Sequence, residues 1–396
     1  MKKEKWVIIV KVFEGCLKMK NNKLILKIAL LSCPLVTASA NAIAGNIPEI
    51  AKSFPEVPLS TIELMTTIPS LFVMLTILAS PVVSAKTGRK TAIAAGAFLC
   101  GIGGVLPFFI QNIYLMLAAR ALFGIGSGLI SANLLILILS FFEGEERSSM
   151  IGLQGSIGGL GSLLATFIAG RLLVFGWNVS FLTYLIGFAV CVFVLLFIPE
   201  TENEDEEKKR TERKPEWGKI FFWSFLSFFS VNLATFFVIK GSSLITGYGY
   251  GTVQDGSTVI MCISAGSLLA GAMYGKIYAG LKEMSLVLFY VMSAVSFVIG
   301  GVSQNLMLTF AAAFVLGYGY LAFVPFLQEK AGVYGSSGTT VLLVMQSLGS
   351  FVTPYFGTFL NLFTEELKIQ FLICAALYAV LTVTAVIIAH GTEIRQ

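Results

Sequence analysis

The sequence has few charged residues for its length. Only 12% of its 396 residues are Asp, Glu, Lys or Arg, and 56% are hydrophobic, whereas a soluble domain carries about 25% charged residues. This composition cannot cover a surface that meets water on all sides, which excludes a soluble enzyme, a nucleic-acid-binding protein and a disordered chain. The net charge of +5 does not indicate nucleic acid, because membrane proteins collect Lys and Arg in cytoplasmic loops.

Groups that carry chemistry are also scarce. His390 is the single histidine and lies in the C-terminal tail, which excludes a His-based triad or zinc site within the chain. The six cysteines are scattered without a CxxC pair, so neither a disulfide framework nor a metal cluster is indicated. No Walker motif is present. We therefore expect no enzyme activity, no metal and no cofactor. Any energy that the protein needs is expected to come from an ion gradient or from the gradient of its solute.

Long apolar stretches are what the sequence has instead. A membrane-spanning helix needs about 20 mostly apolar residues, and turn or charge signals such as KTGRK and EGEER separate the stretches. The sequence predicts an all-α membrane protein with twelve transmembrane helices, at 24–48, 60–84, 91–110, 112–140, 147–173, 178–198, 217–244, 255–279, 284–302, 305–328, 336–361 and 366–389.

The charges gather outside these stretches. Residues 199–216 hold 13 charges and residues 1–23 hold 9. We expect a cytoplasmic extension at 1–23, a flexible cytoplasmic linker at 199–216 and a cytoplasmic tail at 390–396. With the N-terminus inside, 22 of the 27 Lys and Arg lie on the inner side, which predicts a multi-pass protein of the plasma (inner) membrane with both termini cytoplasmic. Met19 resembles a natural start, so residues 1–18 are expected to be a start-site extension, and the alternative is an amphipathic segment that lies on the membrane surface.

The two halves of the chain resemble each other. The blocks 24–198 and 217–389 are nearly equal in length, and the segment 161–169 matches 349–357 position by position in its small residues. FGIG at 123–126 matches LGYG at 316–319 at a similar offset. Matched pairs favour duplication, which predicts two pseudo-symmetric six-helix bundles joined by the linker.

This layout resembles the major facilitator superfamily. Between the second and third stretches that family shows G-x-L-A-D-R-x-G-R-K, and this sequence has PVVSAKTGRK at 81–90, with Ala85 in place of the Asp. Arg120 and Gly124 match the drug:proton antiporter branch, as does the antiporter motif of the fifth stretch, with Thr166 in place of its Pro. By this resemblance, the residues that control the conformational change are Lys86, Gly88, Arg89, Lys90, Gly161, Thr166 and Pro354.

Arg120 is the first candidate for the transport pathway. A charge inside the bilayer is expensive and therefore functional by default; the alternative is a structural salt bridge between helices. The other candidates are polar or aromatic residues within the stretches, for which cavity lining and helix–helix hydrogen bonding are equally open. They are Asn41, Asn133, Gln154, Asn232, Tyr318 and Gln346, and Tyr320, Phe236 and Phe237 could add aromatic walls.

A membrane-embedded acid is what the sequence does not show. Glu63 follows Ser60 by three residues, which favours a capping box at the start of the second stretch. Lys240, near the outer end of the seventh, is expected to snorkel to the interface. If protons drive transport, their binding site is therefore not evident.

The resemblance implies a secondary active transporter that works by alternating access. We expect a monomeric exporter that is coupled to protons. Its solute is expected to be a hydrophobic or weakly cationic small molecule, because few charges would line its cavity. Two alternatives stay open: metabolite uptake or facilitated diffusion, and a transporter-like sensor that moves no solute.

Overall fold

The computed structural model describes residues 23–142, 144–199 and 216–393, and its regular structure in these ranges is helical. The expected extension and linker lie almost entirely outside the described residues, whereas of the expected tail only residues 394–396 do, because α15 continues to Glu393. The elements are α2 (Lys23–Thr37), η1 (Ala38–Asn41), η2 (Ala44–Asn46), α3 (Ile47–Ser53), α4 (Leu59–Thr87), α5 (Arg89–Val105), η3 (Leu106–Phe108), α6 (Ile113–Phe141), α7 (Gly144–Leu172), η4 (Leu173–Phe175), η5 (Val179–Leu185), α8 (Ile186–Phe197), α9 (Trp217–Gly247), α10 (Val253–Leu281), α11 (Met284–Val302), α12 (Leu306–Gly332), α13 (Gly335–Phe351), α14 (Thr353–Asn361) and α15 (Leu367–Glu393).

Within the described residues, 11 helical segments are long and apolar enough to cross a membrane. They correspond to eleven of the twelve expected stretches, and the chain is a multi-pass membrane protein. The remaining stretch, 336–361, is divided into α13 and α14, which meet at Val352. Pro354 lies in the first turn of α14, and its missing N–H interrupts the helical hydrogen-bond ladder at this point.

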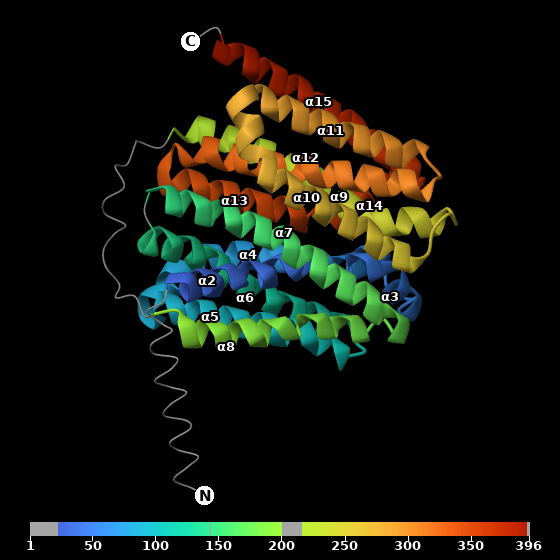
Figure 1. Cartoon of the computed structure of the whole chain (residues 1–396). Coiled ribbons are helices and arrows are strands. Elements are labelled where there is room, and N and C mark those ends of the chain that lie inside the picture. The colour runs from blue at the N-terminus through green and yellow to red at the C-terminus, as the bar shows by residue number, and fades with distance from the viewer. Residues whose placement is uncertain (1–22, 143, 200–215, 394–396) are drawn as a thin grey trace, which may run out of the picture.

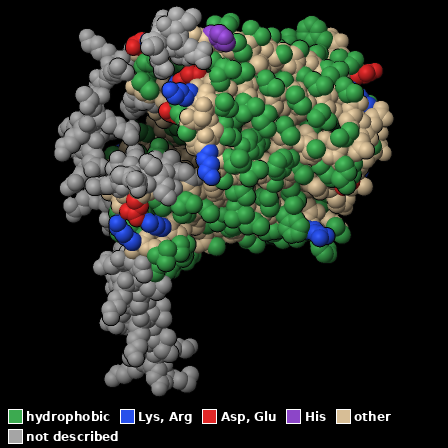
Figure 2. Space-filling model, turned by 45° about the horizontal axis from the view of Figure 1, so that its top comes forward, with side chains coloured by type: hydrophobic (Ala, Val, Ile, Leu, Met, Phe, Trp, Pro, Cys, Tyr) green, Lys and Arg blue, Asp and Glu red, His purple; other side chains and the backbone are tan. Residues whose placement is uncertain are grey.

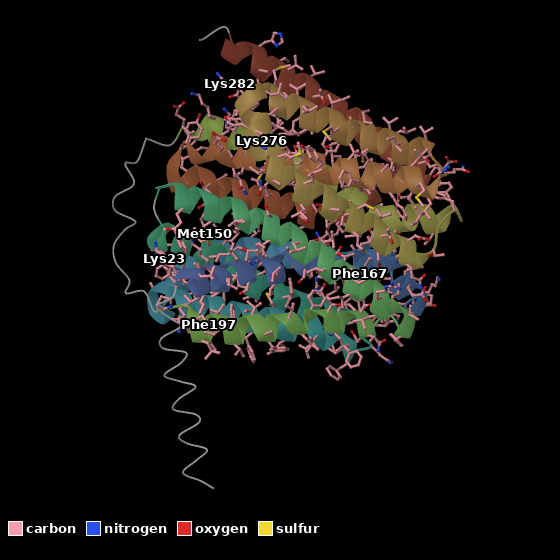
Figure 3. The ribbon with its side chains drawn as sticks, viewed as in Figure 1. Lys23, Met150, Phe167, Phe197, Lys276 and Lys282 are labelled. Atoms are coloured by element: carbon pink, nitrogen blue, oxygen red, sulfur yellow. The ribbon has the colours of Figure 1, made fainter. Side chains whose placement is uncertain are left out.

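The helices run side by side, so that the molecule has two ends (Figure 1). We call the end where α2 begins and α15 finishes the terminal end, and the end that holds α3 the distal end. Lys23, Phe197, Lys276 and Lys282 lie toward the terminal end (Figure 3). Hydrophobic side chains cover the middle of the surface, and charged ones lie toward its two ends (Figure 2), as expected for a middle that faces lipid.

The described residues form two hydrophobic cores, one before and one after positions 200–215 of the sequence. One is built from residues between Leu26 and Ile198, and the other from residues between Leu226 and Ala385, with Ala44 added. We call residues 23–199 the N-terminal half and residues 216–393 the C-terminal half. The halves meet chiefly where α7 packs on α10 and where α4 packs on α13.

Close helix contacts recur at matched positions in the two halves. Each is a site where a Cβ would press on a neighbouring backbone, which is how glycine lets helices approach in a membrane. The matched pairs are Gly126 on Gly96 with Gly319 on Phe289, Gly161 on Leu35 with Gly349 on Phe228, and Gly124 on Pro69 with Gly317 on Ile263. The glycines that opened the sequence comparison therefore occupy equivalent contacts.

Candidate functional site

A cavity of about 190 Å³ lies between the two halves. Its polar lining comes from both halves and consists of Asn41, Ser162, Thr235, Ser264, Ser267 and Tyr320. Its apolar lining includes Ala38, Val238, Ile263 and Leu316. No Asp, Glu, Lys, Arg or His is among the described residues of the lining, so the site offers hydroxyls, one amide and apolar contact rather than a counter-charge.

Asn41 reaches the cavity because the first membrane segment is not a continuous helix. The expected stretch 24–48 is broken into α2, two short 3-10 turns and the start of α3. Asn41 ends the first of these turns. Irregular backbone at membrane depth is tolerated where it lines a cavity or is buried in protein, and both conditions apply here.

Three of the expected amides join helices within one half. Asn133 of α6 accepts from Ser84 Oγ (2.6 Å) and donates to Ser80 Oγ (3.0 Å), both on α4. Asn232 of α9 donates to the Gly349 carbonyl (2.9 Å) at the end of α13. Gln346 of α13 donates to Ser227 Oγ of α9 (2.9 Å). The structure therefore places these three amides at helix contacts rather than in the cavity lining.

Of the expected residues Tyr318, Tyr320 and Gln154, only Tyr320 lines the cavity. Tyr318 is buried, and its hydroxyl lies 3.7 Å from the sulfur of Met273. Its neighbour Tyr320 faces the cavity. Gln154 is half-buried on α7, and the cavity lining on that helix is formed by Gly159 and Ser162 instead.

Sequence reasoning missed the serines of the cavity. Ser264 and Ser267 are three residues apart on α10, so they share one face of the helix. A pair of hydroxyls on one face of an apolar stretch is the signal that could have identified them. Ser162 bonds Ser264 across the two halves (2.9 Å), and the sequence of its own stretch gives no sign of this partner.

Arg120 is fully buried, and its partners are backbone carbonyls. Its Nε donates to the Met65 carbonyl (2.9 Å) and its Nη2 to the Ala40 carbonyl (2.6 Å). The guanidinium also lies over the rings of Phe123 (4.7 Å) and Tyr184 (4.9 Å). Such stacking is a further stabilising contact for a desolvated cation.

The two carbonyls are available for physical reasons. A helical carbonyl bonds the N–H four residues later, so Pro69, which has no N–H, leaves the Met65 carbonyl without its helical partner. Ala40 lies in the 3-10 turn where the first segment is broken. Gly124 permits α6 to approach α4 closely beside Pro69, because a Cβ at position 124 would lie 2.3 Å from the Pro69 oxygen.

Glu63 is not the helix cap that the sequence favoured. The N-cap of α4 is Pro58, and the Glu63 side chain is fully buried. Lys240 Nζ of α9 donates to Glu63 Oε1 at 2.7 Å, and the Lys240 side chain is 11% exposed. The expectations of a capping box and of a snorkelling lysine are therefore wrong, because the two side chains neutralise each other across the halves.

This ion pair is part of a contact seam on the distal side of the cavity. Ser242 Oγ donates to the Gly45 carbonyl (2.8 Å), and Ser257 Oγ donates to Asn46 Oδ1 (3.2 Å). We call these two contacts, together with Glu63–Lys240, the distal seam. All three join the N-terminal half to the C-terminal half.

The expected gate residues lie in several places. Gly88 separates α4 from α5 at a φ of 79°, which favours glycine. Lys86 is exposed, Arg89 is half-buried and Lys90 is buried. The basic turn is at the terminal end, because α4 starts close to α3 and crosses the molecule before it ends at Thr87. Gly161, Thr166 and Pro354 are buried within helices.

One acidic residue at the terminal end binds two basic neighbours. Glu146, at the start of α7, binds Lys27 (2.7 Å) and Lys23 (3.2 Å) of α2. These hydrogen bonds hold the pKa of the Glu146 carboxyl below its usual range.

Comparisons with known proteins agree with this architecture. A family model described as Major Facilitator Superfamily matches residues 30–354. The riboflavin transporter RibZ of Clostridioides difficile is 24% identical over 192 residues, which are 48% of this chain and 42% of the relative. The quinolone resistance protein NorB of Staphylococcus aureus is 27% identical over 196 residues, 48% of this chain and 40% of the relative.

A third relative comes from a eukaryote. Vacuolar basic amino acid transporter 1 of Saccharomyces cerevisiae is 30% identical over 118 residues, 30% of this chain and 20% of the relative. The matches thus span less than half the length of each of these curated relatives.

Proposed function

The chain belongs to the major facilitator superfamily, and on that premise we propose that it exports a hydrophobic or weakly cationic small molecule in exchange for protons. It is a transporter and not an enzyme. The observation that carries the proposal is an uncharged cavity between two halves whose distal side is held together by the distal seam.

The cavity chemistry selects the solute. Ligand pockets usually measure about 300–1,000 Å³, so a cavity of 190 Å³ suits a small solute or must widen when the halves move. Hydroxyls and apolar surface without a carboxylate favour neutral or weakly basic amphipathic molecules. A basic amino acid would leave its charge without a partner in this lining.

We propose twelve spans in two pseudo-symmetric six-helix bundles, with α13 and α14 acting together as the eleventh span. The matched glycine contacts support this arrangement. The terminal end is then cytoplasmic, because the basic residues are concentrated there. The protein works in the plasma membrane as a monomer, with both termini inside, and the distal seam is its outer gate.

This geometry supports a mechanism of alternating access. The distal seam closes the cavity toward the outside, and rocking of the halves opens it outward. The relatives support two directions of transport: a quinolone resistance protein fits export, whereas a riboflavin transporter fits the second candidate, metabolite uptake.

Transport by everted membrane vesicles tests the proposal. A panel of radiolabelled riboflavin, a quinolone and lysine is added with an imposed inward-acid proton gradient. We expect uncoupler-sensitive accumulation of an amphipathic member and none of lysine. Uptake that stops at equal concentrations inside and outside, and that the uncoupler does not change, would favour a facilitated carrier, whereas no transport of any probe would contradict export.

A further inference from the structure

Resting on the proposed function, we propose that Glu63 and Lys240 form a proton-operated latch, in which Glu63 carries the coupling proton and its pairing with Lys240 holds the outer gate shut. The two side chains are 177 residues apart in the sequence and belong to different halves. Their contact therefore exists only while the distal side is closed.

The carboxylate is the less satisfied partner. Glu63 Oε1 accepts from Lys240, but Oε2 is buried without a hydrogen-bond partner among the described residues. Removing one partner from a buried pair is strongly unfavourable, because the other charge stays uncompensated. In the closed seam Lys240 stabilises the Glu63 carboxylate, and a proton on Glu63 would leave Lys240 buried without a counter-charge, which favours separation of the halves.

Lys240 is the charge that controls the protonation of Glu63, because the ionisable groups on the neighbouring elements α3, α6, α13 and α14 have other partners or are exposed. On α6, Arg120 is bound to the carbonyls of Met65 and Ala40 rather than to an acid. On α3, Glu49 and Lys52 bind each other at 2.9 Å. The one ionisable side chain of α13 and α14 is Tyr355, which is exposed.

The pair also lies in the right place. Lys240 is two residues beyond Val238 and five beyond Thr235 on α9, and both of these line the cavity. In the other half, Gly45 and Asn46, which follow the cavity residue Asn41, bond α9 and α10. The latch is thus on the distal side of the solute site.

The proton step balances with water alone. With the gate open, Glu63 takes a proton from a hydronium ion outside, leaving water, and Lys240 is solvated. When the gate closes, the proton passes from Glu63 to water in the cavity and leaves on the inner side. The carboxylate then pairs with Lys240 again, so each cycle carries one proton inward.

The test measures gate opening without any solute. In a cysteine-free background, S257C places a thiol in the distal seam, and a membrane-impermeant maleimide is applied from outside to intact cells. Its labelling rate is divided by that of E56C, an exposed position, which corrects for the reagent's own pH dependence. The E49Q variant, which breaks an exposed ion pair on α3, is the matched control.

We expect slow labelling of S257C that rises as the external pH falls. E63Q should raise the rate about tenfold at every pH, since it removes the closed-state preference, and E49Q should not. The charge swap E63K/K240E should restore slow labelling. If E63Q is not produced, the double variant E63Q/K240Q, which leaves no unpaired charge, should show the same rapid labelling.

Equal, slow and pH-independent labelling of E63Q or E63Q/K240Q and the parent would overturn the latch. Because labelling needs no solute, this result is separate from failure of the vesicle assay. Uncoupler-sensitive export with an unresponsive seam would refute the latch and leave the proposed function standing.

Discussion

A guanidinium inside a membrane needs partners, and Arg120 finds them in two backbone carbonyls and two aromatic rings. The arrangement uses the planar fork of arginine, which presents donors in fixed directions and stacks on rings. Its Nη1 is buried without a partner among the described residues. Arg120 therefore ties α6 to α4 and to the broken first segment.

Replacing Arg120 with lysine separates shape from charge. R120K keeps the charge but cannot reach two carbonyls while stacking on Phe123 and Tyr184. Each buried carbonyl left unpaired costs about 1–3 kcal/mol. We expect R120K to lose most uncoupler-sensitive transport and to unfold at a lower temperature in detergent. Full activity and an unchanged unfolding temperature would show that charge alone matters.

At the scale of elements, the course of α4 depends on Pro69 and Gly124. Pro69 frees the carbonyl that Arg120 uses, and Gly124 admits the backbone of α4 at close range. The sequence shows an Arg followed by Gly four residues later, but the reason for that spacing lies on another helix. One turn of α6 places both residues against the same stretch of α4.

Adding one methyl group at this contact tests that account. G124A would place a Cβ 2.3 Å from the Pro69 oxygen, and overpacking of this kind costs about 1–3 kcal/mol. We expect G124A to have a lower midpoint of thermal unfolding, as measured by size-exclusion chromatography of heated samples in detergent. The control is G158A on α7, whose Cβ would meet Ala38 at an ordinary 3.8 Å. Equal midpoints for the two variants would contradict the close-contact explanation.

For the whole molecule, the sequence predicts what is local. Membrane spans follow from the length of apolar stretches, and the repeat follows from matched small residues such as Gly161 and Gly349. The sequence cannot predict side-chain pairs that form only when the two halves come together. Glu63 resembles a helix cap because Ser60 lies three residues before it, and its partner Lys240 is 177 residues away.

Transport by alternating access requires the distal seam to open. In a cysteine-free background, the pair N46C/S257C replaces a 3.2 Å contact across the halves and should form a disulfide on oxidation. We expect transport to stop and to return with a reductant. The control pair S84C/N133C replaces a 2.6 Å contact within one half. If transport survives complete cross-linking at positions 46 and 257, then transport does not require this seam to open.

The most direct measurement of the central claim is the distance across the distal end in proteoliposomes. Spin labels at K52C on α3 and Q254C on α10 occupy exposed positions. Both residues line a second hollow, at the distal end, which lies between α3 on one side and the adjoining ends of α9 and α10 on the other. Pulsed electron paramagnetic resonance should show two distances between the labels. The shorter one comes from molecules with a closed seam, and the longer one should increase in population as the pH falls. A single distance that no change of pH alters would contradict alternating access driven by protons.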